Sequence, residues 1–465
     1  MRADGSRLKV HPADVRGKWL TARRVVFVVL MAVYVLAPFI PIGGHPAIQL
    51  DVQHRRFYLL GNTFNAQDFW MMVLIILTFV FALLFLTAWR GRIWCGWACP
   101  QTVFLEGVYR PIERFFEGSR DKRLRLDKEP WGLAKTARFA AKHLTFLAVS
   151  LLIAHTATAL FVSPRELALM IREGPALHLE AFLLTLGFTA ILTFNFSWFR
   201  EQFCVVLCPY GRLQSVLHDR DSITVAYDER RGEPRGGLKK NVASATPRGD
   251  CVDCHRCVVV CPTAIDIRNG LQMECLACLQ CVDACDEVMT KIGKPTGLIG
   301  LYSQNQQAGR GRHFLRPRMV IYGLAFLLVS SVLAASFVRR TPFEANLLRP
   351  RGSSPFFLDG DTVRNSFEIH LVNKRAETTT FRIEVLSPVE ARVVIGTPIV
   401  ELASLADTRV PISVSIERED LPAALELQVR ISDTQGDLIE KPMRFLAPPG
   451  MGKKEDEDHE GDEKD

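Results

Sequence analysis

The sequence predicts a multi-domain membrane protein with a five-helix transmembrane bundle, a cysteine-rich soluble segment inserted before the last helix, and a C-terminal all-β sandwich. Three observations predict this architecture. Five apolar runs are each long enough to cross a bilayer, which takes about 20 residues in a helix. All twelve cysteines fall between residues 95 and 285. Beyond residue 366, apolar and polar residues alternate with a period of two, as in strands.

The apolar runs contain no Asp, Glu, Lys or Arg, which favours membrane spans over buried helices of a soluble protein. They cover Val25–Gly44, Phe69–Trp89, Leu144–Val162, Ala181–Phe199 and Met319–Val338. The first run follows a 24-residue charged tail and has no small-residue cleavage site, so we expect a retained span and not a signal peptide. Residues 25–220 are therefore expected to form a four-span domain, and residues 319–338 the fifth span.

Basic residues in the flanking segments predict the orientation of these spans. The tail 1–24 carries seven Lys and Arg and the loop 90–143 carries twelve, whereas the loops 45–68 and 163–180 carry two each. The N-terminus, the loop 90–143 and the segment 200–318 are therefore expected in the cytoplasm, with the C-terminal region exported. This asymmetry accounts for most of the net charge of +7, so we expect no nucleic-acid partner.

Two stretches of the soluble segment 221–318 share the spacing Cys-x2-Cys-x2-Cys-x3-Cys, which is typical of bacterial ferredoxins with two 4Fe-4S clusters. In such proteins the fourth cysteine of each stretch binds the other cluster. One cluster would take Cys251, Cys254, Cys257 and Cys285, and the other Cys275, Cys278, Cys281 and Cys261. Cysteines confined to the reducing side of the membrane also favour redox chemistry over disulfides. The segment is therefore expected to conduct single electrons.

Two other interpretations of these cysteines explain less. Residues 251–255 match the Cys-x-x-Cys-His pattern of c-type haem attachment, but the match is embedded in the longer repeat and is expected in the cytoplasm. Structural zinc would use four cysteines and leave the repeated spacing without a reason. We expect His255 to be a loop residue that tunes the cluster potential and not a ligand.

A second pattern, Cys-x3-Cys-Pro, occurs twice, each time at the cytoplasmic end of a span. Cys95 and Cys99 follow the second span, and Cys204 and Cys208 follow the fourth. The proline after each pair favours the first turn of a new helix, so Cys99 and Cys208 are expected at helix N-termini, where the thiolate is favoured. The matched topology suggests a parallel internal repeat with four thiols between its halves.

The role of these four cysteines is left open between buried apolar thiols, a dithiol relay and metal binding, and soft thiolates suit both Cu(I) and iron–sulfur. Residues 100–117 have helical apolar spacing and are expected to form an interfacial helix. His143 and His155, on or beside the third span, are weaker candidates for a haem or quinone contact, because such histidines usually hydrogen-bond between helices.

After the fifth span, residues 339–450 are expected to form an Ig-like sandwich with a docking or scaffolding role. Alternation predicts strands at 367–371, 381–385, 412–416 and 425–431. The last fifteen residues, 451–465, carry eight acids and are expected to be disordered.

Three stretches together resemble the cytochrome c oxidase accessory protein family (CcoG, also called FixG or RdxA). They are WCGWACPQTVFLEGVYRPIERFFEG from residue 94, CPYGRLQSVLHDRDSITVAYDERRGEPRG from residue 208 and ECLACLQCVDACDEVMTKIGKPTGLIG from residue 274. The order of spans, twin cysteine pairs, double-cluster segment, last span and Ig-like end matches as well, so the resemblance covers residues 20–450.

The resemblance implies a multi-pass protein of the bacterial inner membrane that reduces Cu(II) to Cu(I) during assembly of a cbb-type cytochrome c oxidase. It implies two 4Fe-4S clusters on the eight ferredoxin-type cysteines, and it makes Cys95, Cys99, Cys204 and Cys208 the candidates for binding copper. Assembly factors such as copper chaperones or a copper transporter would be partners, with an electron donor still to be identified. A quinol-linked polyferredoxin subunit and a non-redox assembly scaffold are the alternatives, and a homo-oligomer is left open.

Overall fold

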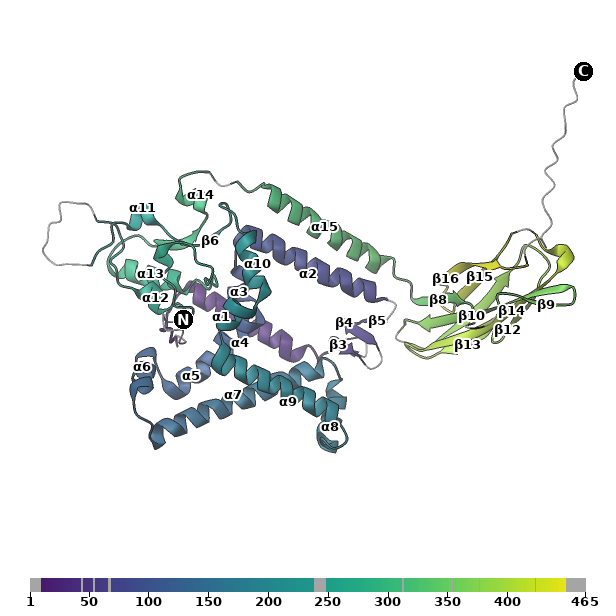
Figure 1. The fold of residues 1–465 in the computed structure, drawn as a ribbon, viewed down its shortest axis with the longest axis horizontal. Coiled ribbons are helices and arrows are strands. Elements are labelled where there is room, and N and C mark those ends of the chain that lie inside the picture. The colour runs from purple at the N-terminus through teal and green to yellow at the C-terminus, as the bar shows by residue number, and fades with distance from the viewer. Residues whose placement is uncertain are drawn as a thin grey trace, which may run out of the picture. The chain divides into compact units, whose positions relative to one another are not determined.

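The computed structural model describes residues 10–42, 45–52, 55–65, 68–237, 248–311, 313–350, 352, 354–375, 377–422 and 424–448. The chain divides into two compact units, Met1–Ala335 and Ser336–Asp465 (Figure 1). The first unit holds the long helices together with the cysteine-rich segment, and the second holds the C-terminal strands. The acidic tail predicted to be disordered lies outside the described residues.

Five long apolar helices form, as the sequence predicts. They are α1 (Lys18–Leu36), α2 (Phe69–Arg90), α7 (Leu133–Ala159), α9 (Leu179–Phe194) with its π-helical continuation η3 (Asn195–Phe199), and α15 (Pro317–Val338). Each is long and apolar enough to cross a membrane. Many of their Leu, Ile, Val and Phe side chains are exposed at the protein surface, as expected for side chains that face lipid.

The bounds of the first helix differ most from the prediction. We expected Val25–Gly44, whereas α1 begins at Lys18 and ends at Leu36, before Pro38. The basic residues of its first turns do not prevent the helix, because Arg23 is buried and donates to the backbone oxygen of Gly96 at 2.7 Å. Pro38 cannot continue the helix because it has no backbone N–H to donate to the preceding turn. The expected span, which was defined by a run without charges, therefore begins and ends several residues after the observed helix.

Short strands join the first two spans. The strands β3 (Ile48–Asp51), β4 (Arg56–Leu59) and β5 (Asn62–Phe64) form an antiparallel sheet, and β1 (Pro41–Ile42) pairs with β2 (His45–Pro46). The backbone N–H of Leu50 donates to the carbonyl of Leu160 at 2.6 Å, which ties the sheet to the end of α7. In Figure 1 these strands lie at the end of the long helices opposite the cysteine-rich segment.

The segment after α2 is helical, as predicted, but it is not a simple interfacial helix. It comprises α3 (Ile93–Trp97), α4 (Pro100–Phe104), the π-helical turn η2 (Leu105–Tyr109), α5 (Arg110–Glu117) and α6 (Arg120–Lys128). In α5 the apolar Phe115 is 83% exposed, whereas Arg110, Glu113 and Glu117 are buried. The charged side faces inward because its side chains form ion pairs with buried residues of neighbouring segments. Glu117, for example, contacts Lys142 of α7 at 2.6 Å.

The cysteine-rich segment is closed by an antiparallel pair of strands, β6 (Thr224–Tyr227) and β7 (Ile299–Tyr302), which brings its two ends together. Between them lie α11 (Glu229–Gly232), α12 (Arg256–Val259), the 3-10 turn η5 (Ile267–Asn269) and α13 (Gln280–Lys291), and α14 (Gln304–Gln307) follows β7. Apolar residues of the strands and of α13 form its core around the cysteines.

The described residues before the first span, 10–17, pack on the cysteine-rich segment. The backbone N–H of Ala13 donates to the carbonyl of Val259 at 2.9 Å. Ala13 and Val15 are buried in one cluster with Val260 and Ala284 of the cysteine-rich segment. The chain before the first span is therefore anchored on the segment that follows the fourth.

The second unit is a sandwich of two antiparallel sheets, as predicted. One sheet has the order β12 (Arg392–Ile395), β14 (Asp407–Glu417), β10 (Thr362–Asn373) and β8 (Phe343–Leu348), with β9 (Phe357–Asp359) also paired to β10. The other has the order β13 (Ile399–Leu402), β11 (Thr379–Leu386), β15 (Leu425–Asp433) and β16 (Leu438–Phe445). The four predicted strands are confirmed as parts of β10, β11, β14 and β15. Their inward-facing apolar side chains form one core.

Candidate electron-transfer site

The two Cys-x3-Cys-Pro stretches have the same backbone course. The helix before the first stretch ends at Gly91, with φ 58° and ψ −133°, and the helix before the second ends at Arg200, with φ 52° and ψ −123°. Each of these residues lies four positions before the first cysteine of its pair. Cys99 and Cys208 both have extended backbone and immediately precede a new helix, α4 and α10 (Pro209–Leu217). The internal repeat suggested by the sequence therefore exists in the backbone.

Contacts around Arg200 hold the two copies of the repeat together. A positive φ is rare for a residue with a side chain, and it persists only where the surroundings fix it. Here the Arg200 guanidinium pairs with Glu113 of α5, and its backbone oxygen accepts from the Gln101 amide at 3.0 Å. Gln101 belongs to the first copy and also accepts from Asn195 at 2.7 Å. The turn of the second copy is thus bound to the helix of the first.

The four thiols of the two pairs lie in one region between these copies. Cys95 is buried, and the other three are partly buried. The Sγ atom of Cys95 donates to the side-chain oxygen of Gln214, on the helix that follows the second pair, at 3.4 Å. Burial is the main reason why the pKa of Cys204 is raised to about 12, and Cys99, Cys95 and Cys208 add to it electrostatically. The two pairs are therefore close enough to act on one another.

The expectation that the helix N-terminus makes Cys99 a thiolate is wrong for the metal-free chain. Burial raises the pKa of Cys99, although the backbone N–H groups of Gln101 and Thr102 oppose the rise. Burial likewise raises the pKa of Cys95 to about 12, against the influence of Arg92. Burial therefore favours the protonated form of Cys95, Cys99 and Cys204, and a metal that binds there displaces the protons.

The two ferredoxin-type stretches also repeat an unusual backbone conformation. Asp253 and His255 in the first stretch are left-handed, with φ of 54° and 55°. Ala277 and Leu279, at the corresponding positions of the second, have φ of 51° and 62°. Alternation of right- and left-handed residues points successive N–H groups into a concave nest, a structure that binds anionic groups, including iron–sulfur clusters. Strained non-glycine residues at matched positions fit loops that wrap around a cluster.

The eight cysteines of this segment fall into two sets according to which thiols raise the pKa of one another electrostatically. The pKa of Cys285 is raised to about 12, by burial first and then by Cys257, Cys254 and Cys251. Burial also raises the pKa of Cys281, and Cys278, Cys275 and Cys261 add more to this rise than Cys257 of the other set does. The structure therefore brings Cys261 to the second stretch and Cys285 to the first.

Within the described parts of the chain, no group of three or more His, Cys, Asp or Glu side chains is arranged to hold a single metal ion. A four-iron cube is larger than one ion and holds its thiolates at its corners, farther apart than the ligands of a single ion. The nests and the two sets of buried thiols fit groups of that size.

The first membrane pair packs directly on the loop of the second ferredoxin-type stretch. A side-chain carbon at Gly96 would overlap the backbone oxygen of Leu276 and would lie 2.9 Å from that of Ala277. The indole N–H of Trp97 donates to the same Ala277 oxygen at 3.3 Å. Leu276 and Ala277 lie between Cys275 and Cys278, so the loop that would surround one cluster touches the turn between Cys95 and Cys99.

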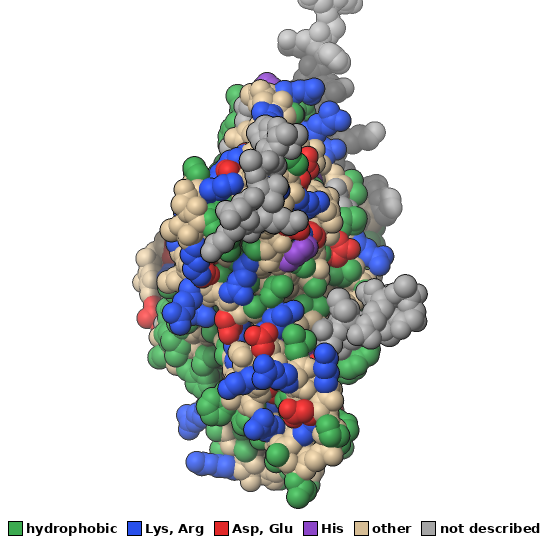
Figure 2. Space-filling view, turned by 90° about the vertical axis from the view of Figure 1, so that its left-hand side faces the viewer, with side chains coloured by type: hydrophobic (Ala, Val, Ile, Leu, Met, Phe, Trp, Pro, Cys, Tyr) green, Lys and Arg blue, Asp and Glu red, His purple; other side chains and the backbone are tan. Residues whose placement is uncertain are grey.

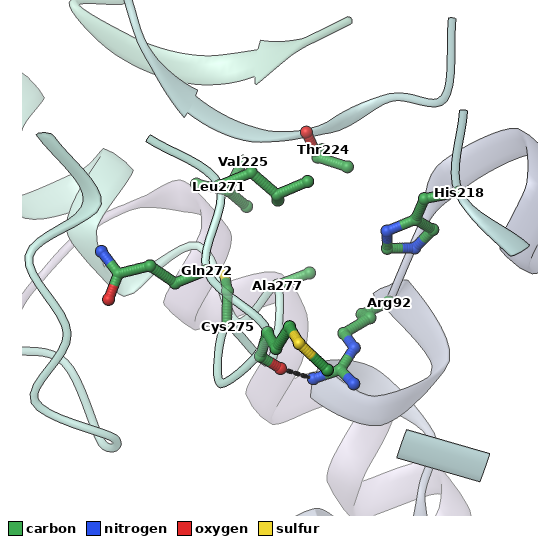
Figure 3. A pocket seen from close by; sticks show the side chains of 9 residues that line it. Arg92, His218, Thr224, Val225, Leu271, Gln272, Cys275 and Ala277 are labelled. Carbon is green, nitrogen blue, oxygen red and sulfur yellow. Dashed lines mark hydrogen bonds between the residues drawn. The ribbon is translucent and has the colours of Figure 1, made fainter. Parts of the chain in front are cut away.

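Arg92 joins three parts of the site. Its guanidinium donates to the backbone oxygen of Met273 and to that of Gly211 on the helix after the second membrane pair. It also lines a cavity of about 120 Å³ together with Cys275 and His218 (Figure 3). One side chain thus holds the cluster loop against both copies of the membrane repeat.

Other polar residues play different parts from those expected. Of the two arginines that precede the cysteine pairs, Arg92 lies close enough to Cys95 to act on it electrostatically, whereas Arg200 pairs with Glu113. Gln214 was missed because an amide has no sequence signal that links it to a distant thiol. His143 and His155 each contact the carbonyl four residues earlier in their own helix, at 3.1 and 2.8 Å, and not a neighbouring helix.

Comparisons with known proteins match three parts of the chain to described families. Residues 199–304 match the family described as a 4Fe-4S dicluster domain, and residues 69–120 match a 4Fe-4S binding domain. Residues 333–448 match the family described as an IG-like fold at the C-terminus of FixG, a putative oxidoreductase.

Full-length relatives are similar along most of the chain. The protein RdxB of Cereibacter sphaeroides is 35% identical over 81% of this chain and 82% of its own length. RdxA of the same organism is 33% identical over 82% of both chains. The nitrogen fixation protein FixG of Rhizobium meliloti is 32% identical over 82% of this chain and 79% of its own.

The long apolar helices and the two cluster-binding segments define a membrane-associated electron-transfer protein that carries 4Fe-4S clusters. The relatives match about four fifths of the chain, and this share is large enough to assign the chain to their family. The chain belongs to the FixG/RdxA family, which confirms the resemblance found in the sequence.

Proposed function

We propose that the protein is a cupric reductase: electrons from two 4Fe-4S clusters reduce Cu(II) to Cu(I) at the four membrane thiols. The observation that carries this proposal is the packing of the loop 275–278 on the turn between Cys95 and Cys99. Because this contact places a cluster loop directly against a soft-ligand site, an electron has a short path between them.

The cluster ligands are assigned from the two sets of neighbouring thiols. Cys251, Cys254, Cys257 and Cys285 hold one cluster, and Cys275, Cys278, Cys281 and Cys261 hold the other. The second set is the one whose loop touches the membrane pairs, so its cluster is called the proximal cluster here and the other the distal cluster. When bound, each cluster accepts and releases one electron at a time.

The residues around the membrane thiols have distinct tasks. Cys95, Cys99, Cys204 and Cys208 supply soft ligands that favour Cu(I) over Cu(II), and they lose their protons as the metal binds. Gln214 accepts the hydrogen bond of Cys95 and fixes the direction of that thiol. Arg92 fixes the distance between the cluster loop and both pairs. Copper is the substrate of the reaction and leaves as Cu(I).

The reduced copper is destined for assembly of a cbb-type cytochrome c oxidase. Copper chaperones or a copper transporter would receive it, and the exported Ig-like unit would dock such partners or a second copy of the chain. We place the N-terminus and the clusters in the cytoplasm of a bacterium and the C-terminal unit beyond the inner membrane. The basic side chains spread over the cluster end of the molecule in Figure 2 support this orientation.

An anaerobic assay with a Cu(I)-specific chelator tests the reductase. Dithionite-reduced protein, freed of excess dithionite, is expected to convert Cu(II) to chelated Cu(I) in proportion to its cluster content. Serine variants at Cys95, Cys99, Cys204 and Cys208 should lose this activity and keep their iron. Unchanged Cu(I) production in all four variants contradicts the assignment of the copper site.

A second candidate gives the membrane thiols a third 4Fe-4S cluster, with a redox partner other than copper. Two observations favour it: residues 69–120, which contain Cys95 and Cys99, match a 4Fe-4S binding domain, and the four thiols are not arranged around one ion. Iron analysis separates the two candidates. About eight iron atoms per chain correspond to two clusters, and about twelve to three.

A further inference from the structure

A cavity of about 460 Å³ lies beside the proximal cluster loop, between α1, η2 and the start of α13. One wall is apolar and belongs to the first span, with Phe27, Val28 and Met31. The other end is polar and is lined by Arg23, Glu106 and Gln280. The cavity therefore has a lipid-like side within a membrane helix and a hydrogen-bonding side next to the cluster segment.

Arg23 is the main polar group of this cavity. Its side chain is 1% exposed, and its Nη1 atom lies 4.0 Å from the Glu106 carboxylate. Its Nη2 atom has no hydrogen-bond partner among the described residues. A buried donor without a partner costs about 1–3 kcal/mol, and more when it is charged. An oxygen atom of a bound molecule would satisfy it.

The polar end of the cavity is next to the proximal cluster. Gln280 directly precedes Cys281. With its amide oriented to satisfy both neighbours, Gln280 accepts from Arg23 at 2.9 Å and donates to the backbone oxygen of Val260 at 2.8 Å. A molecule bound to Arg23 and Gln280 is therefore within electron-transfer reach of the cluster.

We infer that this cavity binds the head group of a membrane quinol, which is the electron donor of the two clusters. The inference rests on the proposed function for the destination of the electrons. A quinol matches the cavity because its ring and tail are apolar and its two oxygens are polar. It also releases electrons singly, as a cluster requires. A nicotinamide nucleotide transfers a hydride, which is an electron pair, and would need a flavin in between.

A quinol supplies two electrons, which is the number that two one-electron clusters can hold. One quinol loses two electrons and two protons to become the quinone. When bound, the two clusters would hold these two electrons, one each. Two Cu(II) ions then take one electron each and leave as two Cu(I). Glu106 accepts the hydrogen bonds of the quinol hydroxyls, and the two protons pass to water at the exposed side of Arg24.

The experiment uses the full-length protein, purified anaerobically in nanodiscs, with decylubiquinol and a short-chain menaquinol as donors. Cluster reduction is followed by EPR, and Cu(I) formation is followed with the chelator. A parallel set of reactions, the dithionite arm, uses dithionite in place of quinol as the electron donor. Met31→Trp fills the apolar side, and Gln280→Ala removes the polar contact. Val29→Trp, on an exposed position of the same helix that does not line the cavity, is the matched control.

We expect Met31→Trp and Gln280→Ala to slow quinol-driven reduction about tenfold or more, equivalent to about 1.4 kcal/mol, while the dithionite arm and the iron content stay unchanged. Val29→Trp should behave as wild type. A second cavity of about 340 Å³, lined by His155 and Thr185, is the competing location, so His155→Ala is the other control. If His155→Ala alone slows the quinol arm, the assignment of the cavity is overturned.

Two further outcomes bear on the inference. If no quinol reduces the clusters of the wild type, or if Met31→Trp removes only a co-purified phospholipid and leaves the quinol arm intact, the inference fails. The proposed function then stands as long as the dithionite arm still yields Cu(I). If quinol reduces the clusters but neither arm yields Cu(I), the proposed function fails and the quinol site is supported.

Discussion

Gly96 is the residue at which the membrane thiols and the cluster segment meet. It lies next to Cys95 and has no side chain, so the backbone of Leu276 and Ala277 can approach it directly. A larger residue must push the two loops apart, because backbone oxygens cannot rotate away as a flexible side chain does. The closeness of the two redox sites therefore depends on one missing methyl group.

Gly96→Val should slow electron transfer from the clusters to copper by about tenfold to a hundredfold, the usual cost of misplacing reacting groups by about 1 Å. Stopped-flow reoxidation of reduced clusters by Cu(II) measures the rate. Gly187→Val is the matched control, because a side chain at Gly187 of α9 would meet nothing within 4 Å. Equal rates for the two variants would exclude the contact at Gly96 as the electron path.

The cysteines of the site could be predicted from the sequence because a ligand motif is local: its spacing is fixed by a single loop. The partners of those cysteines could not be predicted. Gly96 and Ala277 are separated by 181 positions, and no local pattern indicates that they touch. Arg23 was counted as a topology signal, and its burial depends on a carbonyl at Gly96 and a carboxylate at Glu106, which only the folded chain brings together.

At the scale of elements, α13 connects the clusters to the first span. Between Cys281 and Cys285 it carries Asp283, whose carboxylate accepts from the backbone N–H groups of Trp19 at 3.3 Å and Leu20 at 2.8 Å. These are first-turn donors of α1, which otherwise lack partners at a helix start. Asp283 thus caps a membrane helix from a helix that is remote in sequence.

Asp283→Ala should loosen the start of α1 and cost about 1 kcal/mol, the usual cost of losing an N-cap. Trypsin cleavage at Arg16, Lys18 and Arg24 is expected to accelerate about fivefold, which is what about 1 kcal/mol of local opening gives. Glu287→Ala on the same helix is the control, because Glu287 pairs with the exposed Lys291. Similar cleavage of both variants would show that the cap does not hold the segment.

In the sandwich, Arg375 and Asp433 form a partly enclosed pair at 2.6 Å, with the aspartate side chain wholly buried. Burial alone would raise the pKa of Asp433, but the hydrogen bond from Arg375 and backbone N–H groups lower it below its ordinary value. A group with a lowered pKa in the folded state stabilises the fold above its unfolded pKa, about 3.9 for Asp. The stabilisation is lost as the pH falls through the folded pKa.

Arg375→Ala should therefore destabilise the sandwich by about 3–5 kcal/mol at pH 7, because it leaves the buried Asp433 charge without its partner. The difference from wild type should shrink as the pH falls below about 4. Urea unfolding of the C-terminal unit at pH 7 and pH 3 measures both effects. Glu440→Gln is the control, since Glu440 pairs with Arg430 at the surface and should change stability by less than about 1 kcal/mol.

Elements with a strong periodic signal were predictable, and those defined by long-range contacts were not. The spans and the long strands β10 and β15 follow from hydrophobic pattern alone. Strands of two to four residues, such as β1 and β12, are too short to show a period. The buried charged side of α5 was also missed, because its ion pairs lie on other helices.

At the scale of the whole molecule, the two clusters are not equivalent. The loop of the proximal cluster contacts the membrane pair and lies beside the cavity. The distal cluster is held by the other set of cysteines, which includes Cys257 and Cys285. In the proposed path every electron that reaches copper passes the proximal cluster. The distal cluster serves as the store for the second electron of a two-electron donor.

Serine variants of one ligand from each set separate these roles. Cys278→Ser is expected to lower the iron content from about eight to about four atoms per chain and to abolish Cu(I) production. Cys257→Ser should lose the same iron but keep dithionite-driven Cu(I) production, with about half the yield in a single turnover, because one stored electron is missing. Iron analysis and the chelator assay check both. Equal loss of activity in the two variants contradicts the order of the clusters.

The cap at Asp283 also has a consequence for biogenesis. The first span leaves the ribosome and enters the membrane long before residue 283 is synthesised, since 263 positions separate Asp283 from Leu20. Until the segment with both sets of cysteines has folded around its iron, the start of that span has no cap from Asp283, and Ala13 and Val15 lack the surface on which they pack. A chain that fails to acquire iron is expected to leave this start open to proteases, so cluster insertion would influence which newly made molecules persist.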